Sequence, residues 1–288
     1  MRPKMLNLAC GATYVVDECW TNIDFNSGAD GVIGLNLLEP TPFAAATFDL
    51  VYSSHFFEHL PVHRLSAVLD DWHRILVPGG VLRLVLPDCE EMFCEFLRQR
   101  RDGNHLLADF VIAEIVDQCV RTYPGGLLSR FYERAALGVG SESTMLSSYI
   151  TERNGEAFSY FQDPVNLTRP DQAETWLVRA LRRLRRGALH STHCIADRLR
   201  IQALYALYGR AFVDQNISFA SVGEKHHWLW DYHQVEQLLL AAGFVSVSRV
   251  SHQTSSFRDF PFIPLDMNSD GQPRKGLESM YIEARKPH

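Results

Sequence analysis

Four short segments near the N-terminus, in which apolar residues alternate with or adjoin turn residues, predict the strands of a parallel half-sheet. They are residues 6–10, residues 22–24, the stretch that leads to Asn36 and Leu37, and residues 48–53. Short apolar runs bounded by turn residues are typical of such strands. The stretch from Gly11 to Asp24 is too short for a crossover with a long helix, since a crossover normally needs about a dozen or more residues. We therefore expect one short turn over residues 13–20.

Apolar residues then recur with helical spacing, which predicts a helix that covers the sheet. The positions are Leu65, Val68, Leu69, Trp72, Ile75 and Leu76. The sequence Pro78-Gly79-Gly80 is expected to break the pattern, and residues 81–86 form a fifth apolar run. Asp88 is expected to cap a helix over residues 90–101, because an aspartate side chain accepts hydrogen bonds from backbone N–H groups at a helix start.

From about residue 104 to 221 the sequence changes to helical segments separated by loops marked with Gly and Pro, among them 106–120 and 176–184. This change predicts a helical insertion near the carboxyl edge of the sheet, where it acts as a lid or substrate subdomain. The predicted division of the chain is 1–103 and 222–288 for the two parts of the core and 104–221 for the insertion.

The C-terminal part is expected to complete the core. A helix over residues 231–242, ended by Gly243, is followed by strands over 245–250 and 279–284. Residues 255–275 are rich in Pro, Asp, Ser and Gly and predict a surface loop.

Composition limits the classes of partner. The 288 residues are 46% hydrophobic and 22% charged, as in an ordinary globular protein, and the formal net charge is −6. A pI near 6.0 disfavours a nucleic-acid partner, which would require a broad basic face. The sequence has no apolar run of about 18 residues, no CxxC pair and no signal peptide, so we expect a cytoplasmic protein without membrane contact.

Small and acidic residues follow the first two predicted strands. Ala9, Gly11 and Ala12 lie at the end of the first strand, and Asp24 ends the second. A parallel sheet binds its ligand at the carboxyl ends of its strands, where small residues let the backbone approach the ligand and an acid can bind a ribose diol. These residues predict a site for a nucleotide-type cofactor.

Four motifs in this order resemble the class I S-adenosylmethionine-dependent methyltransferases, in particular the bacterial methyltransferase-11/12-like group. They are Leu-Asn-Leu-Ala-Cys-Gly at 6–11, Trp-Thr-Asn-Ile-Asp at 20–24, Ser-His-Phe-Phe-Glu-His-Leu at 54–60, and Val-Pro-Gly-Gly-Val-Leu-Arg-Leu at 77–84 with Pro87 and Asp88. The resemblance implies an α/β fold: a Rossmann-like, seven-stranded, mostly parallel sheet with helices on both faces, here with a large helical insertion. It also implies S-adenosylmethionine (SAM) as the cofactor.

The resemblance further implies which residues bind the cofactor. They are Ala9, Cys10, Gly11, Ala12, Asp24, Asn36, Leu37, Ser53, Ser54 and His55. Of the three alternating glycines usual in the family's turn, only Gly11 is present, because Ala9 and Thr13 stand at the other two positions. Asn36 stands where the family commonly has an aspartate beside the adenine, and its amide can both donate and accept hydrogen bonds.

Histidines are the candidates for a general base, because imidazole titrates near neutral pH. The candidates are His55, His59, His226 and His227. His55, Glu58 and His59 also spell H-x-x-E-H, which taken alone is an inverted zinc-peptidase signature. A divalent metal ion is a further alternative, because the segment resembles a carboxylate-rich one in ubiquinone-type O-methyltransferases, where an acid stands in place of His55. We expect no metal and interpret the segment as flanking the sulfonium and the substrate mouth.

The expected reaction is transfer of the SAM methyl group to an oxygen or nitrogen of a small polar metabolite of natural-product or saccharide type. Two alternatives stay open: a SAM-using enzyme with a different outcome, such as aminocarboxypropyl transfer or cyclisation, and a non-catalytic SAM-binding protein. A basic run at residues 179–186 is either a solvated helix face or a clamp for a substrate carboxylate or phosphate. A homodimer is compatible with a helical insertion.

Overall fold

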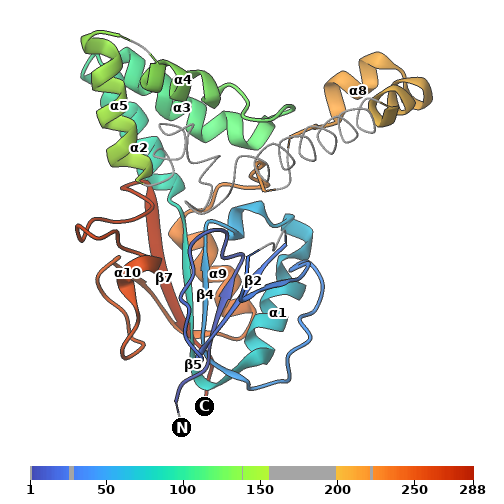
Figure 1. Ribbon diagram of the computed structural model, residues 1–288, viewed down its shortest axis with the longest axis vertical. Coiled ribbons are helices and arrows are strands. Elements are labelled where there is room, and N and C mark those ends of the chain that lie inside the picture. The colour runs from blue at the N-terminus through green and yellow to red at the C-terminus, as the bar shows by residue number, and fades with distance from the viewer. Residues whose placement is uncertain (1, 26–28, 138, 156–198, 221–222) are drawn as a thin grey trace, which may run out of the picture.

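A seven-stranded sheet forms the centre of the protein (Figure 1). The computed structural model describes residues 2–25, 29–137, 139–155, 199–220 and 223–288. The strand order is β3-β2-β1-β4-β5-β7-β6. The strands are β1 (Met5–Leu8), β2 (Trp20–Asp24), β3 (Val32–Gly34), β4 (Phe48–Ser54), β5 (Leu76–Pro87), β6 (Val245–Val250) and β7 (Ser279–Arg285). The predicted seven-stranded sheet is confirmed.

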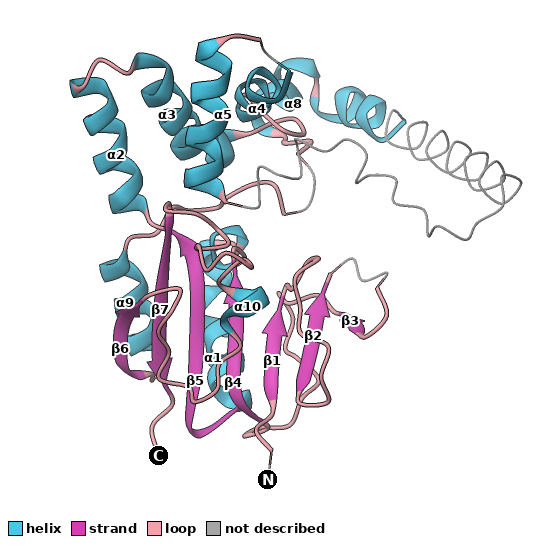
Figure 2. Ribbon diagram, turned by 60° about the vertical axis from the view of Figure 1, so that its left-hand side comes forward, coloured by secondary structure: helices cyan, strands magenta, loops and turns pink. Residues whose placement is uncertain are grey.

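The first five strands are parallel, whereas β7 runs antiparallel to both β5 and β6 (Figure 2). Strand β5 begins at Leu76, earlier than the predicted start at Val81, so it includes Pro78-Gly79-Gly80. The preceding helix ends at Ile75, so the helical pattern does break before these residues. The three residues stay in the strand because they still pair with its neighbours: the Gly79 N–H donates to the Lys286 carbonyl at 2.9 Å.

Two helices cover one face of the sheet. They are α1 (Leu65–Ile75), which follows the short 3-10 turns η1 (Phe57–His59) and η2 (Val62–Arg64), and α9 (Tyr232–Ala241). The predicted apolar stripe of α1 is buried, and it joins residues of α9 and the sheet in the largest apolar core. Asp231 caps α9 by accepting the Gln234 N–H at 2.8 Å.

The opposite face of the sheet is covered by the segment between β6 and β7, which includes the short α10 (Phe262–Leu265). Phe260 and Leu265 are buried there against Tyr52 and Tyr281. The prediction of a surface loop over residues 255–275 was therefore wrong for these side chains. The connection from β1 to β2 is too short to place a helix on this face, so another segment has to cover the apolar side chains.

Further helices form a layer above the carboxyl edge of the sheet (Figures 1 and 2). They are α2 (Cys89–Arg101), α3 (His105–Val120), α4 (Leu128–Leu137) and α5 (Ser141–Asn154), with α8 (Arg210–Asn216) extending to one side. Asp88 caps α2 as predicted, accepting the Glu90 N–H at 3.1 Å. The layer has its own apolar core, to which Met92 of α2 contributes. The predicted helix over 176–184 lies outside the described residues, and the domain boundaries stay a prediction.

The helical layer contacts the sheet at the end of α5. The N–H groups of Leu277 and Glu278, just before β7, donate to the carbonyls of Glu152 and Arg153, both at 3.3 Å. Gly276 has φ +75°, and a Cβ there would lie 1.9 Å from the Arg153 carbonyl oxygen. Only glycine allows this close approach of the two backbones.

Candidate active site

A hydrogen bond joins the turn after β1 to the end of β2. The Gly11 N–H donates to Asp24 Oδ2 at 2.9 Å, and the Cys10 N–H donates to the Ile23 carbonyl at 2.9 Å. Asp24 is half-buried at the carboxyl edge of the sheet, beside the small residues of the turn. A carboxylate in this position can accept hydrogen bonds from both hydroxyls of a ribose.

The backbone around this edge adopts the left-handed conformation at three positions. These are Ala9 (φ 51°), Gly11 (φ 54°) and His55 (φ 50°). No atom lies within 4 Å of a Cβ placed on Gly11, so glycine is favoured there by backbone conformation and not by lack of space. For Ala9 and His55 the conformation costs about 1–2 kcal/mol each. Such strain is typical of ligand-binding positions.

A cavity of about 430 Å³ opens at this edge. Its lining residues are Ala9, Asp24, Phe25, Leu35, Asn36, Leu37, Leu38, His55, Phe56, His59, Leu60 and Gly223. The wall is therefore mostly apolar, with a carboxylate, an amide and two imidazoles as its polar side chains. This combination is typical of a small-molecule or cofactor site.

Glu58 lies behind the cavity wall in η1, with 1% of its surface exposed. Neither carboxylate oxygen has a hydrogen-bond partner among the residues that the structure describes. Oε1 lies 3.5 Å from His55 Nδ1 and 4.0 Å from His59 Nε2. Burial raises the pKa of Glu58 to about 8, because the charged form loses its hydration.

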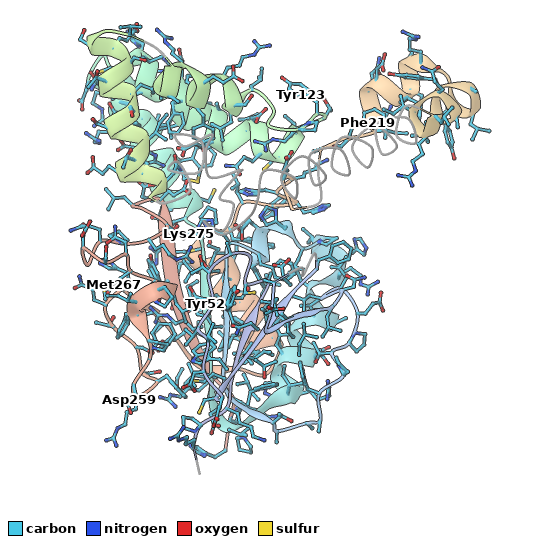
Figure 3. The ribbon with its side chains drawn as sticks, viewed as in Figure 1. Tyr52, Tyr123, Phe219, Asp259, Met267 and Lys275 are labelled. Atoms are coloured by element: carbon cyan, nitrogen blue, oxygen red, sulfur yellow. The ribbon has the colours of Figure 1, made fainter. Side chains whose placement is uncertain are left out.

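His55 contacts β7. Its Nε2 lies 2.8 Å from Ser279 Oγ. Burial, followed by the charges of Lys275 and Arg274, holds the pKa of His55 well below 6.5, so its ring is neutral at pH 7. Figure 3 shows Lys275 at the junction of the sheet and the helical layer.

His59 and His226 are in contact. The His59 Nδ1–H donates to the Lys225 carbonyl at 2.9 Å, which places the ring lone pair on Nε2. The two rings are 4.7 Å apart between centroids at an angle of 73°. His226 is 5% exposed, and no described residue forms a hydrogen bond with its Nδ1. His227, in contrast, is exposed and uses its backbone N–H to bind the Glu58 carbonyl at 2.7 Å.

The zinc-peptidase interpretation of H-x-x-E-H does not fit this geometry. That signature needs both histidines on one face of an α-helix, with the glutamate between them as the base. Here His55 precedes a three-residue 3-10 turn that contains His59. The ring of His55 is directed to Ser279, whereas His59 contacts His226.

Comparison with protein families gives one match. Residues 8–84 match a family model described as a methyltransferase domain, and the matched segment contains Asp24 and the residues of η1. This segment of the chain is therefore similar to a methyltransferase domain, in agreement with the resemblance of its motifs to class I S-adenosylmethionine-dependent methyltransferases. SAM is the cofactor of such a methyltransferase domain. Among curated proteins, none matches the sequence significantly.

Solved structures of methyltransferases are similar over parts or all of the chain, at low identity. One is a SAM-dependent methyltransferase from Mesorhizobium loti, 12% identical, with 99% of this chain and 91% of that chain covered and a TM-score of 0.35. A second is a complex of DhpI with SAH, 24% identical, with 31% and 51% covered and a TM-score of 0.27.

A third is a possible exported protein from Bordetella parapertussis, 13% identical, with 100% and 63% covered and a TM-score of 0.37. The chain thus spans less than two thirds of the length of this protein and of DhpI. All three TM-scores are below 0.5, so the family assignment depends on the matched segment.

The predicted site residues fall into three groups. Six line the cavity: Ala9, Asp24, Asn36, Leu37, His55 and His59. Five lie next to it in the sequence or the fold, namely Cys10, Gly11, Ala12, Ser53 and Ser54, and Ser54 Oγ is 3.4 Å from an Arg274 guanidinium nitrogen. His226 lies behind His59, and His227 is exposed. Their roles stay predictions.

Several site residues were not predicted. One group forms the apolar wall of the cavity and comprises Phe25, Leu35, Leu38, Phe56 and Leu60. Each of them is adjacent in the sequence to a predicted site residue. Their positions just after the ends of strands could therefore have indicated them. Arg274 and Lys275 affect His55 from a segment more than 200 residues away, and nothing in the sequence indicated this.

The basic run at 179–186 lies outside the described residues, so its role as a solvated face or a clamp stays a prediction. In the described part of the chain, no helix combines the length and the apolar character that a membrane span needs.

Proposed function

We propose that this methyltransferase transfers the SAM methyl group to an oxygen or nitrogen atom of a small polar metabolite, of natural-product or saccharide type. One observation carries the proposal: four residues expected to hold the cofactor line the same cavity as two candidate bases, His55 and His59. The four are Ala9, Asp24, Asn36 and Leu37. Methyl transfer requires the acceptor directly behind the sulfonium methyl, so cofactor and acceptor must share one enclosed space.

In the proposed arrangement, the Asp24 carboxylate accepts hydrogen bonds from the ribose hydroxyls of SAM. Asn36 and Leu37 contact its adenine ring. The small turn residues Ala9 and Gly11 allow the methionine part to approach the backbone. The apolar wall excludes water, and desolvation of the charged sulfonium favours a reaction in which that charge is lost.

His55 is the proposed proton acceptor. A neutral imidazole carries one lone pair that can take a proton from a hydroxyl or amine as the new bond to carbon forms. The cations Lys275 and Arg274 favour the neutral ring. A hydroxyl or amine substrate must lose a proton when it is methylated, so it requires a base. The presence of a candidate base therefore supports methylation of an oxygen or nitrogen atom.

A cytoplasmic location is part of the proposal. The cysteines in the described ranges, Cys10, Cys19, Cys89, Cys94 and Cys119, are free thiols. Free thiols are compatible with a reducing compartment.

Calorimetric titration of SAM tests the cofactor site. Asp24→Ala is expected to weaken binding about 10–100-fold, since hydrogen bonds to a charged group contribute about 1.5–3 kcal/mol. Asp30→Ala, which removes an exposed acid that does not line the cavity, is the control and should bind as the wild type does. Equal affinity of Asp24→Ala and wild type would discredit the assigned site.

Product analysis tests the reaction. Incubation with SAM and a panel of saccharides, amines and phenols should yield S-adenosylhomocysteine and an acceptor heavier by one methylene, as measured by mass spectrometry. Aminocarboxypropyl transfer would release methylthioadenosine instead, and a non-catalytic protein would bind SAM without either product.

Replacement of His55 tests the base. Asn tolerates left-handed backbone better than most residues, so His55→Asn removes the base at little cost to the fold. We expect SAM affinity to be retained and kcat to fall about 100-fold or more. The exposed His63 supplies the control variant, His63→Asn. Undiminished kcat in His55→Asn would exclude His55 as the base.

A further inference from the structure

Three side chains that can ligate a metal ion lie close together at the cavity wall and behind it. Glu58, His59 and His226 each offer one ligand atom, and these atoms all lie within 4.8 Å of one another. Glu58 and His59 belong to η1, and His226 comes from the segment before α9, more than 160 residues later. The sequence motif alone does not contain this set, because its third member is distant in the chain.

The polar atoms of this cluster lack the partners that buried groups normally have. Within the described part of the chain, both oxygens of Glu58 and Nδ1 of His226 have no hydrogen-bond partner, and the two residues are only 1% and 5% exposed. A buried polar group without a partner costs about 1–3 kcal/mol. A fold that concentrates several such groups at one point loses stability unless a ligand satisfies them.

His59 is held in the orientation of a metal ligand. Its Nδ1–H donates to the Lys225 carbonyl at 2.9 Å, so the lone pair is on Nε2, which lies 4.0 Å from Glu58 Oε1. In metalloproteins a ligating histidine typically donates its other ring N–H to a carbonyl or carboxylate in this way. The geometry therefore supplies an oriented nitrogen as well as two unpartnered groups.

We propose that Glu58, His59 and His226 bind a divalent transition-metal ion, with zinc as the best match. Two imidazoles and one carboxylate are a known zinc ligand set that keeps a further position open. Magnesium prefers oxygen ligands in octahedral geometry and is disfavoured. In tetrahedral zinc sites the ligand atoms are about 3.4 Å apart, so the side chains need to close by about 1 Å. This proposal departs from the expectation that no metal is bound.

His59 also lines the cavity, so the ion would lie at the wall of the proposed reaction space. The proposal concerns binding of the metal and does not depend on SAM or on the acceptor. It can therefore fail while the proposed function stands, and the reverse is also true.

Calorimetric titration of chelator-treated, full-length protein with zinc chloride tests the site. We expect one zinc ion per chain and no binding of magnesium. Glu58→Gln and His226→Gln preserve side-chain volume and should each weaken zinc binding by at least about 100-fold, because loss of even an outer partner of a ligand typically costs about 10–100-fold. Thermal unfolding of each metal-free variant establishes that it is folded.

His227→Gln is the matched control, since His227 adjoins His226 but is exposed and outside the cluster. Its zinc affinity should equal that of the wild type. The intense visible absorption of tetrahedral cobalt(II), lost in Glu58→Gln and retained in His227→Gln, gives a second measurement. Absence of zinc binding by the wild type, or zinc binding unaffected by Glu58→Gln and His226→Gln, overturns the proposal.

Discussion

Two buried clusters of charged and polar groups, one around Arg83 and one around Glu58, differ in how their polar atoms are hydrogen-bonded. In the first, Arg83 is 0% exposed and donates to Asp266 at 2.7 Å and to Glu283 at 2.7 Å. Its other donors bind the carbonyls of Thr254 and Ser251. In the second, Glu58 and His226 are also buried, but Glu58 Oε1 and Oε2 and His226 Nδ1 have no hydrogen-bond partner in the described ranges of the chain.

The difference indicates different roles. The Arg83 cluster fixes the segment between β6 and β7 against the sheet, because the guanidinium is balanced by two carboxylates and covered by the Phe260 ring at 4.6 Å. A satisfied network of this kind has no capacity left for a ligand. In the Glu58 cluster, polar atoms beside the cavity have no hydrogen-bond partner among the described residues, so they can bind a ligand such as the proposed metal ion.

The largest expected change in stability comes from removing Arg83, the cation of the first cluster. Arg83→Met leaves two carboxylates buried without a cation, and we expect the free energy of unfolding to fall by about 3–5 kcal/mol. Urea denaturation measures the change. Arg98→Met, at an ion pair whose arginine is 58% exposed, should change stability by less than about 1 kcal/mol. Equal effects of the two substitutions would remove the distinction between the buried cluster and a surface pair.

Replacement of Glu58 is expected to change stability in the opposite direction in the metal-free protein. Glu58→Gln removes an ionisable group that is buried without a partner, and the free energy of unfolding at pH 7 should rise by about 1–3 kcal/mol. Urea denaturation in the presence of a chelator measures it. A loss of stability would show that Glu58 is satisfied in solution, and the contrast with Arg83 would then fail.

Relief of backbone strain at Ala9 is expected to change the free energy of unfolding by a smaller amount. Ala9→Gly relieves the left-handed conformation at φ 51° but increases the entropy of the unfolded chain, so we expect a net gain of about 0.5–1 kcal/mol with SAM affinity retained. Ala12→Gly brings only the entropic cost and should be destabilising. Thermal unfolding of the two variants compares them, and destabilisation by Ala9→Gly would contradict strain at the cavity.

The smallest effect concerns Glu95 of α2, a satisfied carboxylate nearer the surface. Burial raises its pKa, but hydrogen bonds from Arg98, Gln99 and Tyr149 outweigh burial and lower the pKa to about 2. Because the folded pKa is below the ordinary value of 4.5, the stabilisation is complete above pH 4.5 and is lost as the pH falls toward 2.

Glu95→Gln should therefore lower stability by about 0.5–1 kcal/mol at pH 7, a value reduced by solvent screening. The difference from the wild type should disappear as the pH is lowered from 4.5 toward 2, as measured by urea denaturation at several pH values. A difference that is constant with pH would indicate packing and not charge.

The sequence by itself determined the sheet, the α1 stripe, the Asp88 cap and the turn beside Asp24. These depend on local periodicity and on short motifs whose residues are neighbours in the chain, so one segment of sequence contains the whole signal. The same holds for the six predicted residues that line the cavity, since they follow directly after strand ends.

Only the tertiary structure decided how distant segments combine. His226 joins Glu58 and His59, Arg274 and Lys275 approach His55, and the segment around Phe260 covers the sheet, all across large separations in the chain. Whether a buried polar atom has a partner depends on what every other segment places beside it. That property is set by the packed fold, and no local pattern of residues contains it.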